Sequence, residues 1–195
     1  MPEHLYPVLT VLLCLFAYLA GSVLFAIPVA RLWGIADPRT SGSSNPGATN
    51  VYRLGGWAPA AVTLVLDALK AWVPVFIAHQ SGFSVMAQVL VALCAVTGHM
   101  IPIFHRFQGG KGVATALGAG LAIAPANTLI MAIIWLGVFL RWKISALASV
   151  CAVATGPLIS ALLEPDTLPL FGLLTLLILV RHRNNLIALS QRRWR

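Results

Sequence analysis

Four polar segments interrupt an otherwise apolar chain, and the residue types in them suit the binding of phosphate. The richest segment, 39–53, has an arginine at each end and glycine, serine, threonine and asparagine between them. Small residues let backbone N–H groups approach an anion, and glycines permit the left-handed turns that form anion nests. Arginine adds charge-assisted hydrogen bonds. We therefore interpret 39–53 as a phosphate-binding loop, since an ordinary helix connection is usually much shorter.

A glycine-rich turn, 109–112, places Lys111 just before the expected start of a helix at residue 113. A helix that begins after such a turn presents N–H groups to an anion, and the lysine adds a point charge. The turn lacks the earlier glycine and the following Ser or Thr of a nucleotide-binding P-loop. By itself it fits a lysine in an ordinary cytoplasmic loop nearly as well.

Three ionisable residues lie within or at the end of apolar runs. His99 follows Gly98 near the end of one run, where an imidazole can carry a proton, bind an anion or form an interfacial hydrogen bond. Asp67 and Lys70 are three residues apart, so they can pair on one helix face. Ionisable groups inside a span point to function by default, but this pair lies deeper than the polar loops and is interpreted as structural.

The sequence contains no metal-ligand spacing and no Ser–His–acid combination on the inner face. It therefore predicts neither a metal nor another cofactor. An enzyme of this kind lacks an obvious protein nucleophile and would suit a substrate that arrives already activated.

The helices that carry these segments are expected to lie in a membrane. Of the 195 residues, 59% are hydrophobic and 9% are charged, whereas a soluble domain has about 25% charged residues. Disorder is excluded because it requires low hydrophobicity. The net charge of +8 is spread thinly between apolar stretches, which favours a role in topology and in binding small anions over nucleic-acid binding.

Six apolar runs predict the membrane-spanning helices, since a span takes about 20 residues. They cover 7–30, 57–79, 84–104, 113–140, 144–163 and 167–180. The 113–140 run is too long for one crossing, and Ala124-Pro125 supplies a break. If this run crosses twice, twelve of the thirteen Lys and Arg lie on one face, all except Lys70, as the positive-inside rule requires.

We therefore predict an all-α integral membrane protein with seven transmembrane helices, two of them short. The N-terminus is expected in the periplasm and the C-terminus in the cytoplasm, with residues 1–195 forming a single domain. The basic tail, 192–195, is expected to contact anionic lipid headgroups.

The polar motifs occur in a recognisable order. They are Gly21-Ser22, Gly42 to Arg53, Gly98 to Pro102, Gly109 to Thr115 and Arg181 to Asn185. Together they resemble the motifs of the bacterial acyl-phosphate:glycerol-3-phosphate acyltransferase family (PlsY type). The resemblance covers nearly the whole chain, including its length and the order of its spans.

This resemblance implies an enzyme of the bacterial inner membrane with its active site on the cytoplasmic side. Such enzymes transfer a fatty acyl group from acyl phosphate to the 1-hydroxyl of sn-glycerol 3-phosphate. The products are 1-acylglycerol 3-phosphate (lysophosphatidic acid) and phosphate, in an early step of phospholipid synthesis. The implied partners are the two substrates, bilayer lipids and, as a candidate, a soluble enzyme that forms acyl phosphate.

The resemblance also assigns roles by motif position. It implies catalytic roles for Ser43, Arg53, His99 and Lys111. It implies that the following residues bind substrate: Gly42, Asn45, Gly47, Thr49, Asn50, Gly109, Gly110, Gly112, His182 and Asn185. The hydroxyl proton has two candidate acceptors, His99 and the departing phosphate oxygen. Two departures stand out, since Ser44 replaces the glycine of many members and the tail after Asn185 lacks the usual Arg, Gly and Glu.

Two other functions fit parts of the pattern. An anion transporter would place basic residues and broken helices near the bilayer midplane, but the candidate residues gather on one face and only Lys70 lies deep. A non-catalytic membrane scaffold would not need the loop rich in Ser, Asn and Gly.

Overall fold

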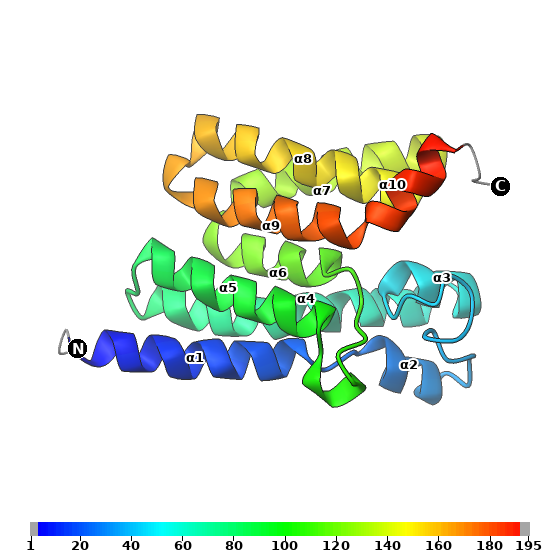
Figure 1. Ribbon diagram of the computed structural model, residues 1–195, viewed down its shortest axis with the longest axis horizontal. Coiled ribbons are helices and arrows are strands. Elements are labelled where there is room, and N and C mark those ends of the chain that lie inside the picture. Colours follow the sequence, from blue (N-terminus) through cyan, green and yellow to red (C-terminus); the bar gives the residue numbers. More distant parts are fainter. Residues whose placement is uncertain (1–3, 192–195) are drawn as a thin grey trace. The chain divides into compact units, whose positions relative to one another are not determined.

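The computed structural model describes residues 4–191, and every regular element within them is a helix. The predicted all-α class is therefore confirmed (Figure 1). The chain forms two compact units, of which the first ends at Ile123 and the second begins at Ala124. The basic tail 192–195, expected to contact lipid headgroups, lies outside the described residues.

Unit 1 is built around one long central helix. Its elements are α1 (Leu5–Gly21), α2 (Ala26–Leu32), α3 (Ala48–Gly55), α4 (Trp57–Gln80), α5 (Val85–Met100), the 3-10 turn η1 (Ile103–His105) and α6 (Val113–Ile123). The central helix α4 packs against α1, α3, α5 and α6, and α1 also packs along α5. Residues carried by any of these helices are therefore positioned through α4.

Glycines allow two pairs of these helices, α1 with α5 and α4 with α6, to approach closely. A Cβ atom on Gly21 of α1 would overlap the Ala95 carbonyl in α5, and Gly98 of α5 faces α1 in the same way. Gly118 of α6 is equally close to the backbone of Ala68 in α4. Close backbone contact through small residues is a common way for helices to associate in lipid, where burying apolar side chains gains little.

The first apolar run contains an interruption that the sequence analysis did not predict. The predicted span over 7–30 lies within Leu5–Leu32, which is long and apolar enough to cross a membrane, but this stretch consists of two helices, α1 and α2. The break releases the carbonyl of Val23, which accepts a hydrogen bond from Lys70 Nζ at 2.6 Å. In lipid, a carbonyl released from a helix must find another partner inside the protein, and Lys70 supplies it here.

Unit 2 contains α7 (Pro125–Trp142), α8 (Ser145–Leu163), the 3-10 turn η2 (Pro165–Thr167), α9 (Leu168–Arg181) and α10 (Arg183–Ser190). Within this unit α8 packs against both α7 and α9. Hydrogen bonds between side chains and neighbouring helices reinforce the packing. Thr175 Oγ1 of α9 donates to the Val153 carbonyl of α8 at 2.6 Å, and Trp135 Nε1 of α7 donates to Ser149 Oγ of α8 at 3.0 Å.

Five helical stretches among the described residues are long and apolar enough to cross a membrane. They are Leu5–Leu32, Trp57–Gln80, Val85–His105, Pro125–Trp142 and Ser145–Leu163. Large apolar side chains cover the outer faces, as on α1, where Val11, Leu12 and Leu15 are each more than half exposed. Polar side chains such as Thr63 and Gln88 are buried instead. This distribution is that of a multi-pass membrane protein, in which polar groups face the protein interior.

The predicted interruption of the 113–140 run is confirmed, because α6 ends at Ile123 and α7 begins at Pro125. Proline is favoured at a first helical position because the N–H group it lacks would have no helical partner there. Both halves of this run were expected to be short. The 11 residues of α6 rise about 17 Å, less than the roughly 30 Å of the hydrocarbon core, but α7 has 18 residues and is long and apolar enough to cross. Seven crossings and the sides of the termini stay predictions.

Candidate functional site

One end of unit 1 gathers the two glycine-rich segments that the sequence singles out. The chain from α2 to the start of α4, which includes α3, lies at the same end as the connection between α5 and α6 (Figure 1). Helices α1 and α5 run toward this end, and α4 and α6 begin there. His99, in the last turn of α5, lies at this end as well.

Asn50 holds the loop before α3 in its shape. The residue is 1% exposed, and its Nδ2 donates to the carbonyls of Pro38 and Ser41 at 2.9 Å each. Its Oδ1 accepts a hydrogen bond from the Ser43 N–H at 2.9 Å. Gly42 has a φ of +64° and passes so close that a Cβ atom would overlap the Asn50 amide. Asn50 and Gly42 thus determine where the exposed Ser43 lies.

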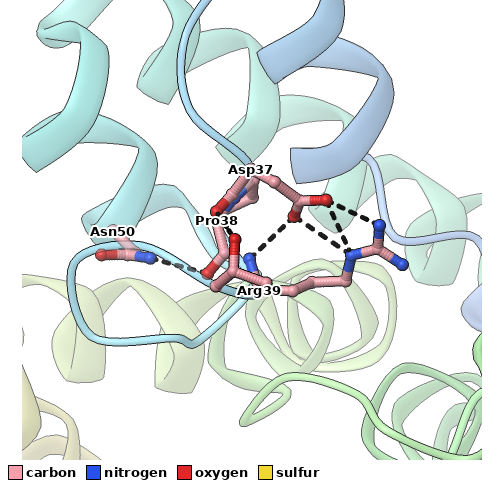
Figure 2. Close-up of polar contacts among 5 residues, drawn as sticks. Asp37, Pro38, Arg39 and Asn50 are labelled. Atoms are coloured by element: carbon pink, nitrogen blue, oxygen red, sulfur yellow. Dashed lines mark hydrogen bonds and ion pairs between the residues drawn. The ribbon is translucent and has the colours of Figure 1, made fainter.

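A surface ion pair stabilises the start of the same loop. Arg39 Nη2 lies 2.6 Å from Asp37 Oδ2, and Arg39 Nε contacts both carboxylate oxygens (Figure 2). The hydrogen bond from Arg39 is the main reason that the pKa of Asp37 falls from 3.8 to about 2. Both arginines that flank the loop are exposed, Arg39 against the Asp37 carboxylate and Arg53 in the last turn of α3.

Gly47 connects this loop to α3. Its carbonyl accepts the N–H of Asn50 at 2.9 Å, which begins the hydrogen bonding of the helix. Asn45 and Thr49 lie two residues before and after Gly47, and both are half-buried. The predicted loop residues therefore surround the first turn of a short helix, whose N–H groups can bind an anion.

The glycine-rich turn before α6 lies against the end of α5. The Gly110 N–H donates to the His99 carbonyl at 3.1 Å. A Cβ atom on Gly110 would overlap the His99 ring at Nε2, and one on Gly109 would overlap the His99 carbonyl. Gly112 has a φ of +77° and its carbonyl accepts the first hydrogen bond of α6 at 2.8 Å. Lys111, which lies between these contacts, is half-buried.

His99 belongs to a buried polar network that its spacing in the sequence does not predict. Its Nδ1 lies 2.9 Å from Lys70 Nζ, and Nζ also lies 2.7 Å from Asp67 Oδ1 and 2.6 Å from the Val23 carbonyl. The side chains of His99, Lys70 and Asp67 are 4%, 3% and 1% exposed. The expected Asp67–Lys70 pair is therefore present, and it is joined to a candidate site residue 29 positions further along the chain.

Unit 2 carries the two remaining candidate residues. His182 follows the end of α9, is 2% exposed, and forms a 2.8 Å hydrogen bond between its Nδ1 and the Ile178 carbonyl. Because a carbonyl can only accept, the neutral ring carries its proton on Nδ1 and its lone pair on Nε2. Asn185 lies three residues later in α10 and is half-buried. That His182 and Asn185 act together with the residues of unit 1 stays a prediction.

The sequence profile of glycerol-3-phosphate acyltransferases matches residues 11–192. The chain belongs to this family. A glycerol-3-phosphate acyltransferase of Hahella chejuensis is 49% identical over 175 residues, which cover 90% of each chain. One from Idiomarina loihiensis is 44% identical over 183 residues, which cover 93% of each chain.

Two crystal structures of PlsY, an integral membrane glycerol 3-phosphate acyltransferase, are similar over nearly the same length. The glycerol 3-phosphate form has a TM-score of 0.89 at 38% identity, and the match covers 95% of this chain and 94% of that one. The lysophosphatidic acid form has a TM-score of 0.88 at 36% identity with the same coverage. The PlsY-type resemblance found in the motifs is therefore confirmed, and the chain is an integral membrane acyltransferase of this family.

Proposed function

We propose that the protein transfers a fatty acyl group from acyl phosphate to the 1-hydroxyl of sn-glycerol 3-phosphate, giving 1-acylglycerol 3-phosphate and phosphate. The observation that carries the proposal is the gathering, at one end of unit 1, of the Ser43 loop, the Lys111 turn and His99. Backbone N–H groups, cations and a hydroxyl suit two substrates that both carry phosphate. The glycerol 3-phosphate and lysophosphatidic acid forms of PlsY support the acceptor and the product.

The chemistry of the donor explains why no protein nucleophile is required. Acyl phosphate is a mixed anhydride with a good leaving group. The acceptor hydroxyl oxygen attacks the acyl carbon, an ester C–O bond forms, and the bond from that carbon to the phosphate oxygen breaks. The hydroxyl proton passes to the departing phosphate oxygen, either directly or by way of His99, so that ester and hydrogen phosphate are the only products.

Some candidate residues stabilise charge, and others orient the substrate. Arg53 and Lys111 hold phosphate groups and offset the charge that develops in the transition state. Ser43 and the N–H groups of its loop orient the acyl phosphate. The remaining candidates bind or shape the substrate site: Gly42, Asn45, Gly47, Thr49, Asn50, Gly109, Gly110, Gly112, His182 and Asn185. Neither a metal nor another cofactor takes part in this scheme.

We place the enzyme in the bacterial inner membrane, with seven crossings, a periplasmic N-terminus, and the C-terminus and active site in the cytoplasm. The positions of the basic residues in the sequence support this orientation. Residues 1–195 act as one functional domain, and a soluble enzyme that forms acyl phosphate would supply the donor.

Incubation of the purified protein with palmitoyl phosphate and glycerol 3-phosphate tests the reaction. We expect lysophosphatidic acid and phosphate in equal amounts, and no product when palmitoyl-CoA replaces palmitoyl phosphate. Product formation from palmitoyl-CoA alone would refute the proposed donor, and no product from either donor would refute the proposed activity.

Labelling in vesicles tests the orientation. Thr40→Cys and Gln108→Cys, introduced after Cys14, Cys94 and Cys151 are replaced by alanine, should both react with an impermeant thiol reagent from the cytoplasmic face only. Reaction from opposite faces would exclude a common site for the two segments.

A further inference from the structure

We infer that Lys70, held by Asp67, fixes His99 in the tautomer that carries its proton on Nε2, so that His99 is a hydrogen-bond donor of the site and not its base. Lys70 and Asp67 are then positioning residues, because they act through His99. This inference rests on the proposed function, in which His99 is a site residue.

The acceptors around Lys70 determine the tautomer. An ammonium group has three N–H donors and no acceptor. Three acceptors surround Nζ, namely Asp67 Oδ1 at 2.7 Å, the Val23 carbonyl at 2.6 Å and His99 Nδ1 at 2.9 Å. The carboxylate and the carbonyl can only accept, so the third N–H of the ammonium is directed to Nδ1. Nδ1 must then present its lone pair, and the neutral ring carries its proton on Nε2.

The other protonation states conflict with the surrounding charges. If His99 donated from Nδ1, Lys70 would have to be a neutral amine, and the buried Asp67 carboxylate would lose its countercharge. If both ring nitrogens were protonated, an imidazolium would lie 2.9 Å from an ammonium. Asp67 Oδ1 is 3.8 Å from His99 Nδ1, within ion-pair distance but too far for a hydrogen bond, and the same oxygen is paired with Lys70 at 2.7 Å, so one carboxylate would have to balance two cations.

The opposite side of the ring faces the glycine-rich turn. Nε2 lies against Gly110, where a Cβ atom would overlap it, and Lys111 follows directly. A donor at Nε2 adds to the N–H groups and the cation that we assign to phosphate binding. A nitrogen that already carries a proton cannot take one from the acceptor hydroxyl. This leaves the departing phosphate oxygen, and not His99, as the acceptor of the hydroxyl proton.

Nitrogen NMR shows which ring nitrogen of His99 carries the proton, and this measurement does not depend on enzymatic activity. In protein labelled with ¹⁵N at histidine, His99 should show an unprotonated Nδ1 and a protonated Nε2, assigned by the loss of these signals in His99→Gln. Replacing Lys70 by methionine should give a mixture of the two tautomers. A protonated Nδ1 in the wild-type protein would overturn the inference, whether or not the protein is active.

Substitutions of His99 separate a donor from a base. His99→Gln keeps an amide N–H donor near the position of Nε2, whereas His99→Ala removes it. We expect His99→Gln to keep kcat within about tenfold of wild type and His99→Ala to lose about a hundredfold. A base would leave both variants equally inactive. His79→Gln, at an exposed histidine in the last turn of α4, is the matched control and should keep full activity.

Substitutions of the positioning pair complete the test. Lys70→Met leaves Asp67 as an unpaired buried charge and can therefore misfold, so the uncharged double variant Asp67→Asn/Lys70→Met is measured beside it, with thermal unfolding as a check of folding. We expect the folded double variant to lose about tenfold or more in kcat with little change in KM for glycerol 3-phosphate, while Asp166→Asn stays unchanged.

The outcomes of the two proposals can be distinguished. Full kcat in a folded double variant would refute the positioning role while leaving the proposed reaction intact. An inactive wild-type protein whose His99 still carries its proton on Nε2 would refute the proposed reaction and leave the tautomer assignment standing.

Discussion

The two units bury polar side chains in different ways. In unit 1, Asp67, Lys70 and His99 bind one another and connect α4 to α5. In unit 2, the side-chain bonds between helices join uncharged groups, from Trp135 Nε1 to Ser149 Oγ at 3.0 Å and from Thr175 Oγ1 to the Val153 carbonyl at 2.6 Å. A bond between uncharged groups can be lost with a mainly local effect, whereas removal of one member of a charged network leaves another buried charge unpaired. Apart from the candidate residues His182 and Asn185, we therefore expect substitutions of buried polar groups to disturb chemistry in unit 1 and mainly stability in unit 2.

The two buried histidines show the same difference at the level of single atoms. His99 Nδ1 faces the Lys70 ammonium and accepts, whereas His182 Nδ1 faces the Ile178 carbonyl and donates. The neutral rings therefore carry their protons on opposite nitrogens. Two residues of one type, assigned to one site from the sequence, have different hydrogen-bonding capacities at Nε2.

The largest effect is expected from the cations of unit 1. Lys111→Ala and Arg53→Ala should each lower kcat/KM by about a hundredfold or more, because each removes a charge that stabilises the transition state. Arg141→Ala, at an exposed arginine in the last turn of α7, is the matched control in unit 2. A near-normal rate in either unit 1 variant, measured as phosphate release, would contradict its assignment.

A smaller loss of activity is expected from one added methyl group. Gly110→Ala places a Cβ atom against His99 Nε2, which should displace the ring or the turn and lower kcat by about tenfold or more. Gly137→Ala in α7 adds the same group where nothing lies within 4 Å. That variant should keep its activity and gain up to about 1 kcal/mol of stability, as alanine is the better helix former. Equal activities of the two variants would count against the close contact at Gly110.

In unit 2, substitutions of His182 test its hydrogen bond to the Ile178 carbonyl. In His182→Asn the side-chain amide can keep the hydrogen bond from the position of Nδ1 to the Ile178 carbonyl, whereas in His182→Gln the amide lies beyond it. Loss of this bond costs about 1 kcal/mol, so the melting temperature of His182→Gln should fall about 2–4 °C below that of His182→Asn. A higher melting temperature for His182→Gln would mean that Nδ1 is not the anchoring atom.

The smallest effect is expected at the exposed Asp37–Arg39 pair. Arg39 lowers the pKa of Asp37 from 3.8 to about 2, so the pair contributes fully above about pH 4 and its contribution is lost as the pH falls toward 2. Asp37→Asn should therefore lower the melting temperature by no more than about 3 °C at pH 7. The difference from wild type should shrink below pH 4, and a difference that grew on acidification would contradict this pairing.

The helices could largely be predicted from the sequence, because a helix that lies in lipid requires a long run of apolar residues. The break at Ala124-Pro125 was also predictable, since a proline and the length of the run both signal it. The break between α1 and α2 was not predicted, although Gly21 ends α1 and Pro28, in the first turn of α2, cannot form the helical bond to the Leu24 carbonyl. What the sequence does not reveal is the partner of the released Val23 carbonyl, which is Lys70 from another helix.

The candidate site was predictable in its residue types but not in its hydrogen bonds. The motifs identify Asn50 and Gly42, yet only the fold reveals that the Asn50 amide binds its own loop. The spacing of Asp67 and Lys70 predicts their pairing, but it carries no information about His99. A broken helix next to a deep lysine was the pattern expected of a transporter, and here it supports a histidine at one end of unit 1.

The three hydrogen bonds of the Lys70 ammonium also affect how the enzyme resists chemical damage by its own substrate. A mixed anhydride such as the proposed donor acylates amines, and it can do so only through the lone pair of an unprotonated nitrogen. With its three hydrogens directed to Asp67, Val23 and His99, Lys70 has no such lone pair, and its side chain is only 3% exposed. The same bonds that orient the imidazole therefore protect this amine from irreversible self-modification by the substrate.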